Sequence, residues 1–113
     1  MHEMSLAESM LEIVEGTARR NGASKVTEVR LEIGALSHVE PDALRFCFDA
    51  VTRRSLAEGA ALVIDVVPGA AWCMPCSETV PVQQVGDACP RCGGYQLAVT
   101  AGDGMRVKDI VVL

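Results

Sequence analysis

The sequence predicts an α+β fold in which a small three-stranded sheet with two helices is interrupted by a cysteine-rich module. Two segments carry apolar residues at helical spacing, and three others are rich in β-branched residues. Two Cys-x-x-Cys pairs fall between the last two of these strands. We therefore expect one α+β domain, residues 1–69 and 98–113, with the module inserted as residues 70–97.

The first predicted helix begins at Ser5, after four residues that show no periodicity and are expected to be exposed. Ser5 and Glu8 form the S-x-x-E pattern of a capping box, in which each side chain bonds the other residue's backbone N–H. Apolar residues then recur at helical spacing until Gly22, a residue type that commonly ends helices. In residues 25–33 apolar and charged residues alternate, which predicts a strand with one buried and one exposed face.

The second predicted helix begins at Glu40-Pro41, because proline suits the first helical position. Its apolar stripe includes Cys47, which we interpret as a small buried residue rather than a metal ligand. Residues 61–67 are almost wholly apolar and predict a strand buried on most of both faces. Residues 106–112 are the remaining strand, and we expect them to pair with residues 61–67.

The charge and the composition limit the classes of function. The chain has 113 residues, half of them hydrophobic, and a formal net charge of −5 from 15 acidic and 10 basic residues. Such an acidic chain is a poor binder of phosphate backbones, so we expect no nucleic-acid partner. The sequence shows no basic and apolar leader and no apolar run that could cross a bilayer, so we expect a cytoplasmic protein without a membrane partner.

The cysteines form the strongest motif, Cys73-Met-Pro-Cys76 followed after twelve residues by Cys89-Pro-Arg-Cys92. Two such pairs are typical of one tetrahedral zinc site with four thiolate ligands. The alternative, two disulfides or four unrelated thiols, is disfavoured in a reducing compartment. Four protein ligands leave no open position on the ion, so we expect a structural site in a zinc-ribbon-like module.

Signatures of enzymes are missing from the sequence, which has two histidines and no phosphate-binding loop, Gly-rich dinucleotide turn or nucleophile elbow. The module also offers little to nucleic acid, because Arg91 is its only base and Trp72 and Tyr95 are its only aromatic residues. We therefore expect a binding protein rather than an enzyme.

The first three residues, Met1-His2-Glu3, can supply a second kind of metal site. A histidine at this position is most often simply an exposed residue. Its bulk, however, predicts that the initiator methionine is kept, so that an α-amine, two backbone amides and an imidazole lie close together. Sets of nitrogen donors in a square plane select Ni(II) or Cu(II) over zinc.

These features together resemble the HypA/HybF family of nickel metallochaperones, which help to mature nickel–iron hydrogenases and, in some organisms, urease. The resemblance covers essentially the whole chain, and the combination of an MHE start with a late four-cysteine site is highly specific. The matching segments are Met1-His2-Glu3, Val26 to Gly34, His38 to Phe48, the two cysteine pairs, and the run that begins at Gly102.

The resemblance implies that nickel binds through the Met1 amine, the imidazole and amide of His2, and the amide of Glu3. It implies a further acidic ligand or positioning group at Glu40, and zinc at the four paired cysteines. Expected partners are a HypB-type GTPase and the hydrogenase large-subunit precursor that receives nickel, with a weak homodimer as a further expectation. Family members often carry a histidine in or beside the zinc module, and this module has none.

Two other hypotheses remain open from the sequence. The chain could be a zinc-ribbon adaptor that binds a protein partner and ignores nickel, in which case an extension of the N-terminus would be harmless. It could also be a metal-dependent hydrolase that uses an N-terminal ion, although few other polar residues converge to support such chemistry.

Overall fold

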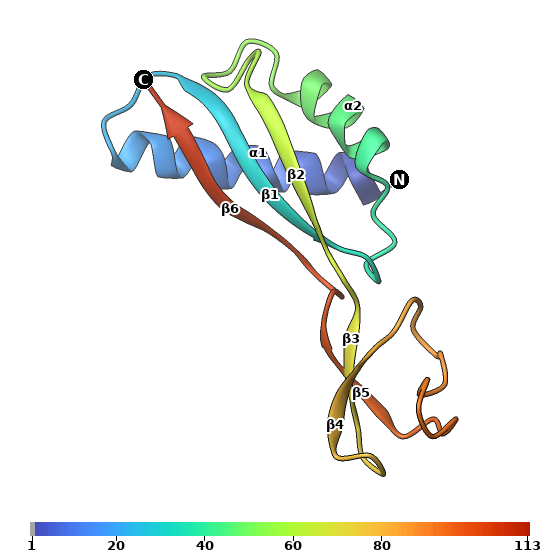
Figure 1. Ribbon diagram of the computed structural model, residues 1–113. Helices are drawn as coiled ribbons and strands as arrows, with labels where there is room; N and C mark the ends of the chain where they lie inside the picture. Colours follow the sequence, from blue (N-terminus) through green and yellow to red (C-terminus); the bar gives the residue numbers. More distant parts are fainter. Residues whose placement is uncertain (1) are drawn as a thin grey trace. The chain divides into compact units, whose positions relative to one another are not determined.

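The structure, a computed structural model, describes residues 2–113 and arranges them in two compact units (Figure 1). The helical unit comprises the residues up to Leu31 together with Val39–Asp65 and Arg106–Leu113, and the cysteine unit comprises Glu32–His38 and Val66–Met105. The elements are α1 (His2–Arg20), β1 (Val26–Gly34), α2 (Pro41–Val51), β2 (Ala61–Val67), β3 (Ala70–Cys73), β4 (Glu78–Pro81), β5 (Leu97–Ala101) and β6 (Met105–Val112).

Helix α1 begins earlier than predicted, at His2 rather than at Ser5. The reason is that its buried stripe extends to the first turn, where Glu3 occupies the position one turn before Ala7. A carboxylate in that turn is also favourable because the N-terminal end of a helix carries partial positive charge. The buried residues of α1 are Glu3, Ala7, Met10, Val14 and Ala18.

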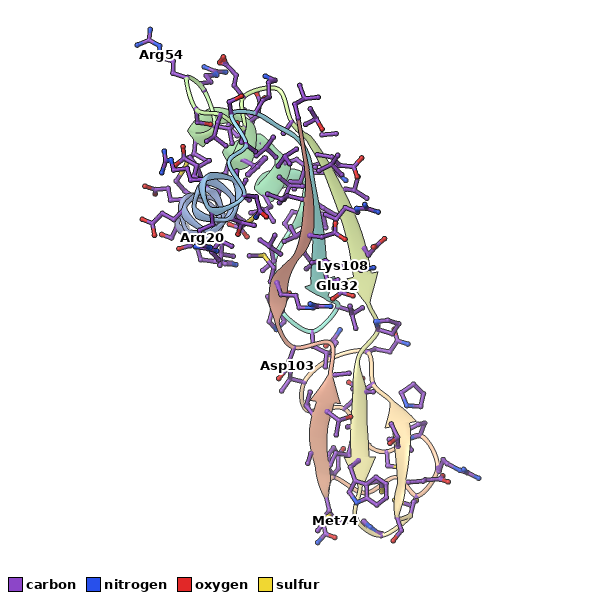
Figure 2. All side chains as sticks on the ribbon, turned by 90° about the vertical axis from the view of Figure 1, so that its left-hand side faces the viewer. Arg20, Glu32, Arg54, Met74, Asp103 and Lys108 are labelled. Carbon is purple, nitrogen blue, oxygen red and sulfur yellow. The ribbon has the colours of Figure 1, made fainter. Side chains whose placement is uncertain are left out.

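Helix α2 follows its prediction. Pro41 is the first helical residue, and the Glu40 side chain caps the helix by accepting a hydrogen bond from the backbone N–H of Asp42 at 3.2 Å. Leu44, Cys47 and Phe48 form its buried face. Helices α1 and α2 contact each other and cover the same face of the first sheet, as the two views show (Figures 1 and 2).

The first sheet has the strand order β2-β1-β6, so the prediction that β6 pairs with β2 is wrong. Strand β1 is central and carries buried Val29, Leu31 and Ile33. Strand β1 runs parallel to β2, and helix α2 connects the two strands. The other edge of β1 therefore pairs with the last strand, β6 (Figure 1). Hydrogen bonds hold the C-terminal segment at this edge. For example, the N–H of Leu113, just after β6, donates to the carbonyl of Lys25, just before β1, at 3.0 Å.

Strand β2 is also more exposed than its apolar sequence predicts. Only Leu62 is buried, and Val66 is 58 % exposed. The reason is its place at the edge of a sheet whose helices cover one face. The Arg45 guanidinium of α2 donates a hydrogen bond to the carbonyl of Leu62.

The cysteine unit contains a second sheet of strand order β4-β3-β5, in which both neighbours pair with β3 antiparallel. Its core is small, with two buried clusters that share contact with Leu97. One cluster consists of Leu36, Ala71 and Val82, and the other of Cys73, Val80 and Cys89. A module with so few large apolar side chains needs an additional source of stability, which a bound metal ion can supply.

Two glycines in the cysteine unit permit a close approach of backbone segments. Gly102 adopts a φ of +86°, and a Cβ atom at this position would lie 2.6 Å from the Pro68 carbonyl oxygen. At Gly69 a Cβ atom would lie 2.8 Å from the side chain of Leu36. Glycine is therefore required at both positions by space, and at Gly102 also by conformation.

Candidate metal sites

The four paired cysteines come together in the cysteine unit. Cys73 ends β3 and Cys76 lies in the turn that leads to β4, whereas Cys89 and Cys92 lie in the loop between β4 and β5. All four Sγ atoms lie within 4.8 Å of one another. The turn that holds the first pair is closed by a hydrogen bond of 2.8 Å from Ser77 N–H to the Cys73 carbonyl, with Ser77 at a φ of 52°.

The spacing of the sulfur atoms fits a zinc ion. Sulfurs at about 2.3 Å from zinc in a tetrahedron are about 3.8 Å apart. In the structure the Sγ atoms of Cys73 and Cys92 lie 3.7 Å apart, and those of Cys76 and Cys89 lie 3.9 Å apart. Both are far longer than a disulfide bond, and all four thiols are free. The donor set therefore suits one tetrahedral ion and leaves no position for a further ligand.

The second cysteine pair is held by backbone hydrogen bonds around Cys89. Its N–H donates to the Gly94 carbonyl at 2.7 Å, and its carbonyl accepts from Gly93 N–H at 2.9 Å. Its sulfur accepts from Arg91 N–H at 3.4 Å. Hydrogen bonds from the backbone N–H groups of Cys92 and Arg91 outweigh burial and lower the pKa of Cys89 to about 7. This thiol therefore ionises more easily than an ordinary cysteine thiol.

In the first pair, Cys73 and Cys76, the pKa values are raised rather than lowered. The Cys73 thiol, together with burial, raises the pKa of Cys76 to about 12. For Cys73 itself the backbone N–H of Cys76 favours the thiolate, but burial and the Cys89 thiol raise its pKa overall. Crowded sulfurs cannot all ionise unless a cation lies between them, so a metal ion would displace protons as it binds.

The fifth cysteine lies outside this cluster. Cys47 is 1 % exposed on the buried face of α2, which confirms its interpretation as a packed residue. Arg91, the only base of the predicted module, pairs with Glu78. No basic surface for nucleic acid forms around the cysteines in the part of the chain that the structure describes.

The N-terminal residues are placed in part. Met1 lies outside the described residues, whereas His2 and Glu3 form the start of α1. The His2 side chain is 57 % exposed, and its Nε2 atom lies 3.2 Å from Oε2 of Glu3, whose side chain is only 12 % exposed. The N–H groups of the first helical turn have no carbonyl partner within the helix, and those of His2 and Glu3 are among them.

Two further residues bear on this site. Glu40 is exposed and caps α2, so its carboxylate already has a structural role. In Figure 1 the start of α2 lies toward the N-terminal end of α1. His38 is exposed and has a φ of 61°.

The sequence analysis considered only the backbone amide of Glu3 and missed the burial of its side chain. The helical spacing of Glu3, Ala7 and Met10 was the signal that could have indicated this burial.

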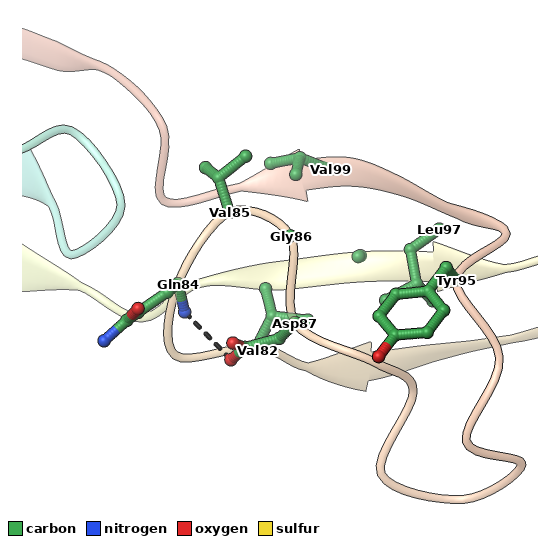
Figure 3. Close-up of a pocket in the computed structure, with 9 residues that line it drawn as sticks. Val82, Gln84, Val85, Gly86, Asp87, Tyr95, Leu97 and Val99 are labelled. Carbon is green, nitrogen blue, oxygen red and sulfur yellow. Dashed lines mark hydrogen bonds between the residues drawn. The ribbon is translucent and has the colours of Figure 1, made fainter.

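A hollow in the cysteine unit is lined mostly by apolar residues. It has a volume of about 180 Å³ and lies between β5 and the loop after β4 (Figure 3). The carboxylate of Asp87 accepts hydrogen bonds from the N–H groups of Gln83 and Gln84, each at 3.0 Å, and so closes that loop. The other lining side chains are mostly apolar, among them Val85, Leu97 and Val99.

None of the helices in residues 2–113 is both long enough and apolar enough to cross a membrane.

The comparisons with known proteins agree with one another over nearly the full chain. Residues 1–112 match the family model described as hydrogenase/urease nickel incorporation, metallochaperone, hypA. A relative from Albidiferax ferrireducens, named hydrogenase maturation factor HypA, is 61 % identical over 112 residues that cover 99 % of each chain. A relative of the same name from Dechloromonas aromatica is 60 % identical, also over 99 % of each chain.

Solved structures show the same fold. The solution structure of the Ni metallochaperone HypA from Helicobacter pylori is 25 % identical, with a TM-score of 0.73 over 98 % of this chain and 97 % of that chain. A second solution structure, of HypA protein, is 27 % identical, with a TM-score of 0.75 over 100 % of this chain and 97 % of that chain. The overall α+β fold of this chain is therefore shared with both.

Proposed function

Because the chain belongs to the HypA family of hydrogenase and urease nickel-incorporation metallochaperones, we propose that it binds one Ni(II) at its N-terminus and delivers it for maturation of nickel–iron hydrogenase. The family description is that of a carrier rather than a catalyst, so the chain is not an enzyme. Its chemistry is the selective binding and release of an ion.

The observation that carries the nickel site is the position of His2 and Glu3 in the first turn of α1. Their N–H groups have no partner within the helix, so nickel could displace a proton from each amide to the solvent without breaking a helical hydrogen bond. The positive end of the helix also favours the negative charge of a deprotonated amide. With the Met1 amine and the His2 imidazole these nitrogens complete the square-planar set that Ni(II) prefers.

Release requires access to the ion. The His2 side chain is more than half exposed, so an acceptor can approach the ion without opening the core. We assign Glu40 a secondary place as an extra ligand or positioning group, because its carboxylate is exposed but already caps α2. Its test is separate from that of His2.

The four cysteines would hold zinc as a structural ion. The sulfur spacing of 3.7 and 3.9 Å and the closed set of four ligands support this assignment. We accordingly assign residues 70–97 to zinc and residues 1–69 and 98–113 to nickel. The partners would be a HypB-type GTPase and the hydrogenase large-subunit precursor, and the transfer would take place in the cytoplasm.

An N-terminal extension tests this function against the adaptor hypothesis. A chain with Gly-Ser before Met1 keeps every residue of the fold but moves the α-amine away from His2. We expect the extended protein to bind zinc as before and to lose one equivalent of planar Ni(II), as measured by visible absorption. Unchanged nickel binding would contradict the amine site and favour the adaptor.

A further inference from the structure

The hollow between β5 and the loop after β4 has a buried apolar floor and an exposed apolar rim (Figure 3). Ala71 and Val82 line it and are buried, at 0 % and 7 % exposure. Val85, Tyr95 and Val99 line it too, yet they are 63 %, 75 % and 39 % exposed. Exposed apolar residues that gather around one depression, rather than lying singly on a surface, mark a place where another molecule binds.

Both walls of the hollow are connected to the cysteine cluster. Asp87 lies two residues before Cys89 on one wall, and Tyr95 follows Cys92 by three residues on the other. The backbone N–H of Cys89 also donates to the carbonyl of Gly94 at 2.7 Å, which joins the two segments directly. The two walls are therefore held by the same segments that form the cluster, so the hollow exists without a partner.

Asp87 gives the hollow a negative charge that no basic residue neutralises. Its Oδ2 atom accepts both hydrogen bonds from the loop, from Gln83 N–H and Gln84 N–H at 3.0 Å each. Its Oδ1 atom has no such partner within residues 2–113. None of the lining residues is basic, and Arg91, the only arginine or lysine of the cysteine unit, already pairs with Glu78. A cation beside the hollow would therefore find an acceptor whose position is fixed.

From these features we infer that the hollow is a docking site for a partner protein, which inserts one bulky apolar side chain beside a lysine or arginine. The volume of about 180 Å³ suits a side chain such as leucine or phenylalanine, since an apolar cavity of about 150 Å³ holds benzene. The basic neighbour would pair with Oδ1 of Asp87. A protein fits better than a small molecule, because Val85, Tyr95 and Val99 extend the apolar surface beyond the hollow itself.

The charge of the cysteine unit favours a basic partner over a second copy of this chain. Apart from Arg91 its charged residues are all acidic, namely Glu32, Glu78, Asp87 and Asp103. The whole chain has a formal net charge of −5. Two copies would therefore repel one another, whereas a basic segment would be attracted. This inference goes beyond nickel delivery and does not depend on the N-terminal site.

A peptide series on the zinc-loaded, full-length chain tests the docking site by nitrogen–proton NMR. The probes are three acetylated and amidated pentapeptides, GKLKG, GKAKG and GELEG. We expect GKLKG to shift the amide signals of residues 82–87 and 95–99 selectively. Replacement of its leucine by alanine should weaken binding by about tenfold, because most of the buried apolar area is lost. The acidic peptide GELEG should bind about fivefold more weakly than GKLKG, because its charges oppose that of Asp87.

Two variants with matched controls connect this binding to the hollow. Val85→Ser removes an apolar rim residue and should weaken binding of GKLKG by about three- to tenfold. Val66→Ser should not, because Val66 is an exposed valine that does not line the hollow. Asp87→Asn keeps an oxygen for the loop N–H groups and replaces the other oxygen by NH₂, so it should remove most of the preference for GKLKG over GELEG. Asp103→Asn changes the charge equally but lies outside the lining, and should keep that preference.

The peptide series on the wild type decides the inference by itself. Signal shifts that avoid the hollow, equal binding of GKLKG and GKAKG, or an absence of GKLKG binding would overturn it. Wild-type affinity in Val85→Ser, with its zinc content and remaining signals unchanged, would overturn it as well. Failure of the nickel site is distinguishable, because His2 belongs to the helical unit and His2→Ala should bind GKLKG as the wild type does.

Discussion

The Sγ atoms of Cys73 and Cys92 lie 3.7 Å apart, which joins the end of β3 to the loop that precedes β5. This distance is close to the edge of a sulfur tetrahedron around zinc, about 3.8 Å. The two residues belong to different cysteine pairs, so an ion between them would fasten that loop to the sheet.

Removal of one zinc ligand should unfold part of the chain only. In Cys76→Ser we expect loss of zinc and of ordered signals from residues 70–97, while the helical signal of α1 and α2 persists in circular dichroism. The reason is that the helical unit has its own buried core, whereas the core of the cysteine unit is small.

The matched control is Cys47→Ala, which should keep the zinc content because Cys47 lies outside the cluster. It should lower the free energy of unfolding by about 1 kcal/mol through the loss of one buried group. If Cys76→Ser lost all cooperative structure, two separately stable units would be the wrong description.

Zinc affinity should fall as the pH falls. Zinc binds thiolates, and in the metal-free protein the pKa values of Cys73 and Cys76 are raised, the latter to about 12. Zinc binding must therefore displace the protons of both thiols at neutral pH. Below a pH of about 7 Cys89 is also protonated, so one more proton competes and the dependence steepens. Competition with a chelator across this range measures the slope, and a flat profile would contradict thiolate ligation.

Nickel affinity should fall below a pH of about 7 for a different reason. Binding displaces protons from the α-amine and the imidazole, whose ordinary pKa values are about 7.7–8.0 and 6.5. Titrations of zinc-loaded protein from mildly basic to mildly acidic pH measure this dependence. An affinity that stayed constant over the range would argue against the amine and the imidazole as ligands.

A methyl group at Gly102 should destabilise the cysteine unit. Gly102→Ala forces a side chain into a positive φ of 86° and against the Pro68 carbonyl, with an expected cost of about 1–3 kcal/mol. Gly104→Ala is the control, since a Cβ atom there meets nothing within 4 Å. Chemical unfolding of both zinc-loaded variants gives the comparison, and equal stabilities would show that the close approach at Gly102 is absent.

The sequence predicted the local features well because they depend on neighbouring residues. The capped start of α2 follows from Glu40 and Pro41, and the two cysteine pairs come together as their spacing indicates. The start of α1 was missed because Glu3, a charged residue, occupies a buried position that its type does not suggest.

Strand pairing could not be predicted in the same way, because it depends on contacts distant in sequence. The apolar run of residues 61–67 indicated a central strand, yet β2 lies at an edge and β1 takes the central place. Likewise, the proximity of His2 to Glu3 depends on where α1 begins, which only the packing of the whole stripe decides.

The most direct test of the account is a nickel titration of untagged, zinc-loaded protein beside His2→Ala, followed by calorimetry and by the visible absorption of planar Ni(II). The account predicts one equivalent of nickel in the wild type and none in His2→Ala, with zinc retained in both. Equal binding by the two proteins, or binding by neither, would contradict an N-terminal nickel site and leave the zinc-ribbon adaptor as the better description.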